Sequence, residues 1–140
     1  MPAGSGYKAS VSWRPTVGSG SWEASALSAA FTVTAAPPQI TISAPTAASS
    51  WKTGSVQMVS WTINPAVATG EFRVWLVSSG GTWYIGKQVL PVASLTSYST
   101  ALTASVPAAA GYKAYVYWRP VAGTGTWEAT AMSAAFTVTP

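Results

Sequence analysis

Apolar and polar residues alternate in several short stretches of the chain, which predicts β-strands. The clearest case is 7–13, where one side of the expected strand carries Tyr7, Ala9, Val11 and Trp13 and the other carries Lys8, Ser10 and Ser12. Similar stretches, bounded by Gly-rich or Pro-containing turns, predict strands at 28–34, 39–43, 55–63, 71–78, 82–89 and 97–106. Residues 50–54 have the composition of a turn between two of these strands.

The stretch 6–34 occurs a second time as 111–139, with a constant offset of 105 residues and no gap. A period of about 100 residues is the size of a whole domain, whereas solenoid and propeller units are shorter. In the second copy of 7–13, Tyr115 and Tyr117 take the places of Ser10 and Ser12 on the polar side, while the apolar side is unchanged. Because side chains alternate across a strand, this pattern indicates an inward apolar face and an outward polar one.

Residues 35–106 occur only once, so the sequence contains one front half and two back halves of the same module. We therefore expect residues 1–34 to be the C-terminal half of an incomplete module, 35–38 a Pro-rich joint, and 39–140 a complete module. Seven or eight short strands, with turns about every eight to twelve residues, predict an all-β fold of immunoglobulin-like antiparallel β-sandwich type.

The composition agrees with this fold and adds a point about the surface. Hydrophobic residues make up 49% of the chain and charged residues only 7%, whereas about a quarter of the residues of a typical soluble domain are charged. Ser, Thr, Val and Ala outnumber the straight-chain helix formers, which favours strands. We expect much of this uncharged surface to be packed against neighbouring modules or chains.

The charged residues exclude several classes of function. The net charge of +4 comes from seven scattered basic residues and three acidic ones, with no basic cluster of the kind that binds nucleic acid. No apolar run in this segment reaches the roughly 18 residues of a membrane span. His, Cys and Asp are absent, and the acids are Glu23, Glu71 and Glu128. We therefore expect no enzymatic activity, no metal site and no cofactor.

The first copy of the repeat lacks the partner strands that its apolar face requires. A sheet of two or three strands with one face uncovered is marginal in water. We expect an assembly interface with other copies or adjacent repeats, formed by the inward Tyr7, Val11, Trp13, Phe31 and Val33 and the outward Tyr115 and Tyr117. Three arrangements remain open: a preceding front half or a neighbouring subunit supplies the strands, two copies exchange strands, or residues 6–34 replace 111–139 in the sandwich.

The aromatic residues offer a second kind of function. Exposed rings stack on sugar faces, and Trp75, Trp83 and Tyr84, with Tyr115 and Tyr117, are candidates for a platform that binds a cell-wall glycan. We expect the other tryptophans in cores (Trp13, Trp51, Trp61, Trp118) or at sandwich edges (Trp22, Trp127). Arg14 and Arg119 are either cation-π partners of Trp22 and Trp127 or solvated strand ends.

Several short motifs follow one another in a recognisable order: ITISAP (40–45), SWKTG (50–54), VSW (59–61), VWL (74–76), SVP (105–107), GY (111–112) and SAAFTV (133–138). Over 39–139 this order resembles the Ser-Thr-rich, cell-wall-synthesis-type immunoglobulin-like modules of fungal GPI-anchored wall proteins and related prokaryotic tandem repeats. The resemblance implies an extracellular, non-catalytic module at the cell surface. We expect a structural protein that assembles into a filament or stalk, with carbohydrate binding or adhesion as the alternative.

Overall fold

The computed structural model describes residues 1–140 as strands, turns and loops without a helix. The prediction of an all-β chain is confirmed. No segment of the structure is therefore a helix of the length and hydrophobicity needed to cross a bilayer. The chain divides into two compact units, Met1–Ala36 and Pro37–Pro140, and the division lies inside the expected joint.

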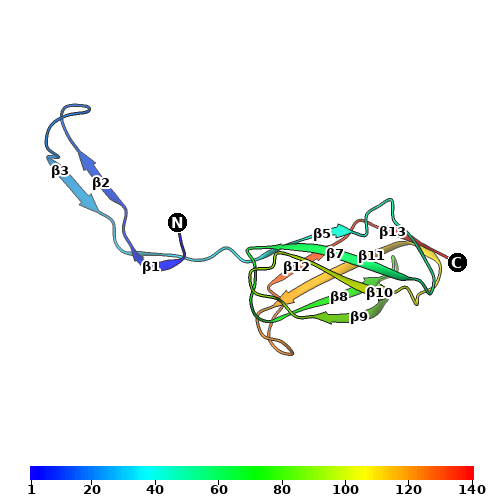
Figure 1. The fold of residues 1–140 in the computed structure, drawn as a ribbon. Coiled ribbons are helices and arrows are strands. Elements are labelled where there is room, and N and C mark those ends of the chain that lie inside the picture. Colours follow the sequence, from blue (N-terminus) through cyan, green and yellow to red (C-terminus); the bar gives the residue numbers. More distant parts are fainter. The chain divides into compact units, whose positions relative to one another are not determined.

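The second unit is an antiparallel β-sandwich with two sheets (Figure 1). One sheet has the strand order β10-β7-β5; the other has the order β6-β13-β11-β8-β9, with β12 also paired to β11. Only β6 and β13 pair in parallel. The strands are β5 (Gln39–Ala44), β6 (Ser50–Lys52), β7 (Val56–Asn64), β8 (Glu71–Val77), β9 (Trp83–Val89), β10 (Ser97–Thr103), β11 (Ala109–Arg119), β12 (Ala129–Met132) and β13 (Phe136–Thr139). The predicted β-sandwich is confirmed, and its immunoglobulin-like topology remains a prediction.

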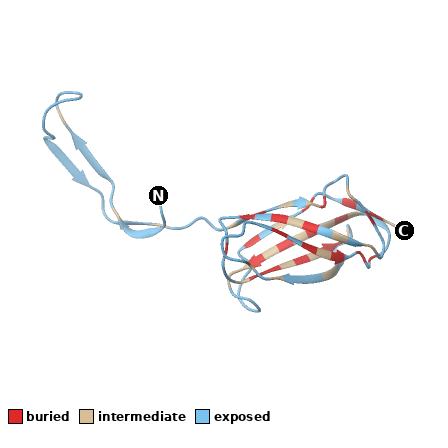
Figure 2. Ribbon diagram, viewed as in Figure 1, coloured by how far each residue is buried: buried red, intermediate tan, exposed pale blue.

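The core of this unit consists of alternate residues from facing strands. Figure 2 shows buried positions alternating with exposed or half-buried ones along these strands. Burial of one large aliphatic or aromatic side chain stabilises a fold by about 1.5–3 kcal/mol. The buried set includes Val59, Trp61 and Ile63 of β7, Phe72, Val74 and Leu76 of β8, and Tyr112, Ala114, Val116 and Trp118 of β11. The predicted core positions of Trp51, Trp61 and Trp118 are confirmed.

Strand β11 is the central element of the larger sheet. It pairs with β8 on one side and with β12 and β13 on the other. At its start, the Tyr112 hydroxyl donates to the Pro107 carbonyl at 2.8 Å, an arrangement typical of the tyrosine corner of immunoglobulin-type sandwiches. The Ala114 N–H donates to Ser133 Oγ at 2.9 Å, where the chain passes from β12 to β13. These two contacts fix the local path of the back half.

The first unit repeats this local path. Its strands are β1 (Gly4–Tyr7), β2 (Ser10–Trp13), β3 (Ala24–Leu27) and β4 (Phe31–Val33). The register of β2 with β3 equals that of β11 with β12 at the offset of 105 residues, and β1 pairs with β4 as β11 does with β13. The Tyr7 hydroxyl donates to the Pro2 carbonyl at 3.0 Å, and the Ala9 N–H donates to Ser28 Oγ at 3.0 Å. Both copies therefore have the same local hydrogen-bond pattern.

The two copies differ in burial. Val11 is 72% exposed, Trp13 56% and Phe31 41%, whereas their counterparts Val116, Trp118 and Phe136 are 0%, 5% and 2% exposed. The prediction that Trp13 lies in a core is wrong for this chain. Its counterpart Trp118 is buried because β11 pairs with β8 and packs against the three-stranded sheet. The first unit contains no strand equivalent to β8 or to that sheet, so Trp13 stays exposed.

Three predicted boundaries also need correction. Residues 7–13 form two strands and not one, because Lys8 and Ala9 have no ladder partner, whereas their counterparts in β11 pair with Val77 and Leu76 of β8. The predicted strand 28–34 is shortened to β4. Ser28 Oγ accepts from the Ala9 N–H and donates to the Ala29 carbonyl, so these residues lie outside the strand. The predicted turn at 50–54 contains strand β6, which β13 holds by parallel pairing.

Candidate functional site

The outer face of the six-stranded sheet carries a continuous cluster of aromatic rings, which we call the aromatic cluster. Ring centroids within it lie 5.2–6.1 Å apart from neighbour to neighbour. Cross-strand pairing brings the residues together, since Trp75 of β8 is directly opposite Tyr115 of β11. The members are Trp75 of β8, Trp83 of β9, Tyr115 and Tyr117 of β11, and Trp127 of the β11–β12 loop.

A glycine makes room for the first of these rings. Gly86 of β9 pairs with Trp75, and a Cβ atom at Gly86 would lie 2.7 Å from carbon atoms of the indole. The indole therefore lies across the bare backbone of β9, where it meets the Trp83 ring edge-on at 6.1 Å and 85°. A side chain at this position would displace Trp75 from its place in the cluster.

Tyr84 does not join the aromatic cluster, although it was expected on the same sugar-binding platform. The pairing of β8 with β9 shifts register by one residue at Ile85, a bulge at which φ is 36°. Tyr84 packs against the core instead, with its ring 6.0 Å from that of Tyr112. Successive side chains of a strand face opposite sides, so Tyr84 faces away from its neighbour Trp83 and the two cannot share one platform.

A hollow of about 510 Å³ opens within the aromatic cluster. Its volume falls in the range of about 300–1,000 Å³ that is typical of small-molecule sites. Burial raises the pKa of the Tyr117 hydroxyl, and the neighbouring Tyr115 raises it further. The hollow is lined by Arg73, Trp75, Trp83, Tyr117, Arg119 and Trp127.

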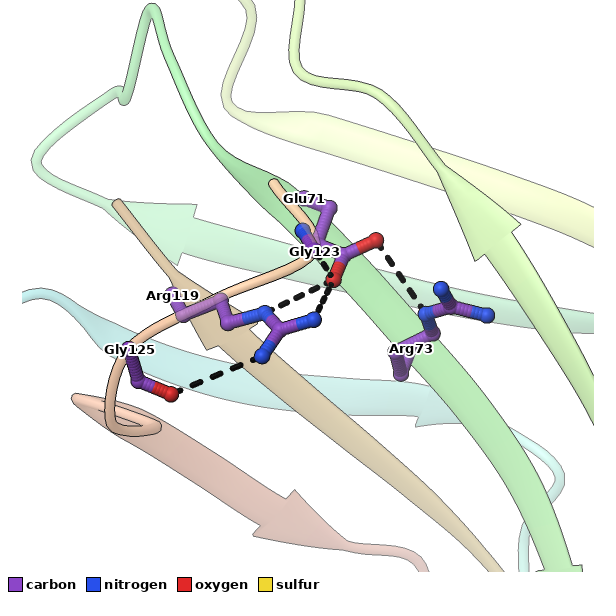
Figure 3. Close-up of polar contacts among 5 residues, drawn as sticks. All are labelled: Glu71, Arg73, Arg119, Gly123 and Gly125. Carbon is purple, nitrogen blue, oxygen red and sulfur yellow. Dashed lines mark hydrogen bonds and ion pairs between the residues drawn. The ribbon is translucent and has the colours of Figure 1, made fainter. Parts of the chain in front are cut away.

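Glu71 organises the charged side of this hollow (Figure 3). It is fully buried and accepts hydrogen bonds from Arg73 Nε at 3.1 Å, from Arg119 Nε at 2.7 Å and also from Arg119 Nη2, and from the Gly123 N–H at 3.1 Å. Burial by itself raises the pKa of this carboxyl, but these hydrogen bonds and the two positive charges lower it below its ordinary value. One carboxylate thus accepts hydrogen bonds from two guanidinium groups, and Glu71, Arg73 and Arg119 together carry a net charge of +1.

The two arginines differ in what they leave available. Arg119 is fully engaged, because it bonds Glu71, approaches the Gly125 carbonyl at 3.5 Å and lies over the Trp127 ring at 4.5 Å. Arg73 uses only Nε, and its side chain is 33% exposed. The two terminal nitrogens of Arg73 have no protein partner, so they are free to donate to a ligand.

Of the two alternatives for Arg14 and Arg119, the structure shows cation-π pairing in both copies. Arg14 lies over the Trp22 ring at 4.9 Å, and Arg119 lies over Trp127 at 4.5 Å. The role of Glu71 was not foreseen. The signal was the alternation of Glu71, Arg73 and Trp75 on one side of a single strand, but only the register of β8 with β11 shows that Glu71 is opposite Arg119.

The other candidate surface is the apolar face of the first unit, which we call the open face. It contains Val11, Trp13 and Phe31 as exposed side chains, and Tyr7 and Val33 as half-buried ones. The Tyr7 and Phe31 rings lie 6.2 Å apart. Tyr115 and Tyr117 belong to the aromatic cluster of the second unit, so the seven residues expected in one interface are divided between two surfaces.

Comparison with models of known protein families and with characterised protein sequences found no match for this chain. The candidate sites therefore rest on the geometry described above.

Proposed function

We propose that this chain is a structural segment of a tandem-repeat surface protein, and that its open face is completed by strands from an adjacent repeat or another copy. The observation that supports this most directly is the pair of back halves. Both have the same strand register and the same side-chain hydrogen bonds, yet only the second has its apolar face covered. The first unit is already folded locally as one edge of a sandwich.

The second unit indicates which strands would cover the open face. There, β8 pairs along β11, and the three-stranded sheet β10-β7-β5 covers the apolar side chains. A segment equivalent to 37–106 is therefore the complement of the open face. Leaving side chains such as Val11, Trp13 and Phe31 in water forfeits about 1.5–3 kcal/mol each, which provides the driving force for association.

One charged contact adds specificity to this complement. Arg14 corresponds to Arg119, and Gly18 corresponds to Gly123, which are two of the three residues that bind Glu71 in the second unit. The first unit thus offers these two donors without an equivalent of Glu71. A strand carrying a residue equivalent to Glu71 would pair with Arg14 and fix the register of the incoming strand.

Serial association of this kind builds a filament or stalk of repeated sandwiches. The order of motifs that resembles cell-wall immunoglobulin-like modules supports an extracellular, non-catalytic role at the cell surface. The low content of charged residues agrees with a surface that is largely packed in an assembly.

Light scattering of the purified chain over a range of concentrations tests the proposal. We expect a mean mass that increases with concentration, because the open faces of different copies bury their apolar side chains against one another. Val11→Lys places a charge on the open face and should hold the chain at the mass of a monomer. Ser10→Lys, the matched control, places the same charge one residue away on the opposite side of β2 and should leave association intact.

Two results would contradict the proposal. One is a chain that stays monomeric at all concentrations while hydrogen exchange shows Val11 and Trp13 protected, because the open face would then be covered within one molecule. The other is equal loss of association in Val11→Lys and Ser10→Lys, because the open face would then have no special role.

A second candidate function is carbohydrate binding by the second unit. The specific observation in its favour is the hollow in the aromatic cluster, with Trp83 49% and Trp127 40% exposed. Flat, half-exposed rings beside hydrogen-bond donors suit the apolar face and the hydroxyl groups of a sugar. This role is compatible with the structural one, since the two surfaces lie on different units.

A further inference from the structure

The hollow contains a positive charge that the fold does not neutralise. Glu71 carries the only carboxylate in contact with Arg73 and Arg119, so two guanidinium groups share one negative charge. Arg119 is held by Glu71, the Gly125 carbonyl and Trp127. Arg73 remains with two unpaired terminal nitrogens beside Trp75 and Trp83.

The pairing of Arg73 with Glu71 also orients those nitrogens. The hydrogen bond from Nε to Glu71 at 3.1 Å fixes the plane of the guanidinium (Figure 3). Because a guanidinium has a rigid fork of donors, fixing one nitrogen fixes the directions of the others. Two terminal N–H groups held in this way match the two oxygens of a carboxylate.

Comparison of the two copies shows that the aromatic cluster is not needed to build the strand. β2 has the same register with its neighbour as β11 has with β12, yet it carries Ser10 and Ser12 where β11 carries Tyr115 and Tyr117. The outward tyrosines therefore do not determine the pairing. They enlarge the aromatic surface around Trp83 in the second unit alone.

We propose that the hollow binds a saccharide that carries a carboxylate, such as a chain of hexuronic acid units. This inference rests on the carbohydrate-binding candidate above and adds the charge of the sugar. The apolar face of one sugar ring stacks on Trp83 and Tyr117, and its carboxylate accepts hydrogen bonds from Arg73. A neutral sugar would offer the Arg73 donors only hydroxyl oxygens, which form weaker hydrogen bonds than a carboxylate does. A cationic ligand would be repelled by the net charge of +1.

The test compares two ligands with the same sugar rings and linkages, one with free carboxylates and one with methyl esters. Oligogalacturonate carries one carboxylate on each ring, and the fully methyl-esterified oligomer keeps the rings and linkages without the charge. Calorimetric titration of the whole chain at low salt should show the acid binding at least about tenfold more tightly than the ester, as expected for one charge-assisted hydrogen bond. The difference should shrink as salt is added.

Variants assign the binding to named residues. Arg73→Gln should abolish the preference for the acid, while Trp83→Ala and the double change Tyr115→Ser with Tyr117→Ser should weaken binding of both ligands. The double change installs the residues of the first copy, so the fold should be kept, and circular dichroism verifies this. Arg14→Gln and Trp22→Ala change the same residue types in the first unit and should have no effect.

Each other outcome overturns a defined part of the inference. Equal binding of acid and ester would leave carbohydrate binding in place and refute the preference for a carboxylate. A preference that survives Arg73→Gln would show that Arg73 is not the anion-binding group. Absence of binding to both ligands would refute the acidic-saccharide site and remove the support for a carbohydrate function, without touching the proposed assembly through the open face.

Discussion

Glu71 shows how one buried acid can join several elements. It lies at the start of β8, it is opposite Arg119 at the end of β11, and it accepts from the Gly123 N–H in the β11–β12 loop. A buried carboxylate without partners would cost several kcal/mol, but four donors satisfy this one. The same contacts hold the loop that carries Trp127 and orient Arg73, so the stability of the sheet and the shape of the hollow depend on one side chain.

Replacement of Glu71 should therefore be costly. We expect Glu71→Ala to lower the free energy of unfolding by about 3 kcal/mol or more, because two partly buried guanidinium groups lose their shared partner. Urea unfolding followed by tryptophan fluorescence measures this change. Glu128→Ala removes an exposed carboxyl and should change the free energy by less than about 0.5 kcal/mol.

The lowered pKa of Glu71 predicts how the stability of the fold depends on pH under acidic conditions. A carboxyl whose pKa is lower in the folded state adds stability that is present above its unfolded pKa of about 4.3 and is lost as the pH falls through the folded value. Stability should therefore fall as the pH drops below about 4.3, and the slope should be smaller in Glu71→Gln. A variant with the same slope as the native chain would show that Glu71 does not control the acid transition.

At the scale of elements, the sequence predicted which side of each strand is buried better than where each strand begins. The apolar side of 112–118 is buried as the alternation indicates. The boundaries depend on partner strands, which the alternation of one segment cannot identify. Lys8 and Ala9 are not part of a strand because the first unit has no equivalent of β8, whereas Ser50–Lys52 forms a strand because it pairs with β13. The hollow was only partly predictable for the same reason, since only the register of β8 with β11 joins Glu71 to Arg119.

The repeated tyrosine contact allows a comparison of one element in two surroundings. Tyr112→Phe removes the hydrogen bond to Pro107 in a buried setting and should lower the free energy of unfolding of the second unit by about 1–2 kcal/mol. Tyr7→Phe removes the equivalent bond at an exposed site and should change stability by less than about 0.5 kcal/mol. Chemical denaturation measures both. Equal effects would mean that burial does not control the contribution of this corner.

At the scale of the whole molecule, the chain contains one sandwich and a smaller unit that repeats the strand pairing of the sandwich's back half. The sandwich has a closed core of residues from both sheets, whereas the first unit has two hairpin-like pairings, β1 with β4 and β2 with β3. Association is thus expected to be a completion of folding as much as a docking of surfaces.

Completion can be tested within a single chain. Pro2 corresponds to Pro107, so fusing a second copy of residues 37–106 directly ahead of Pro2 supplies the missing front half in the correct order. We expect the amides of β2 to become protected from hydrogen exchange to the level seen in β11, because they gain a strand equivalent to β8. The fused chain should also lose the tendency to associate through its first unit.

The control for this fusion carries Val74→Lys in the added copy, a charge at a position that is fully buried in the second unit. This copy should fail to dock, and β2 should keep its fast exchange. Protection of β2 in both fusions would show that the added segment acts without forming the sandwich.

The first copy carries Ser10 and Ser12 where the second carries Tyr115 and Tyr117, which is equivalent to a double substitution. The strand register is the same in both copies, so this substitution does not change the pairing. The outward positions of this strand can therefore be varied independently of the interior. We expect a chain of such units to serve as a display framework, in which the units share the apolar side of this strand and each presents its own outward residues. Randomising positions 10, 12, 115 and 117 should accordingly yield folded proteins with new binding specificities.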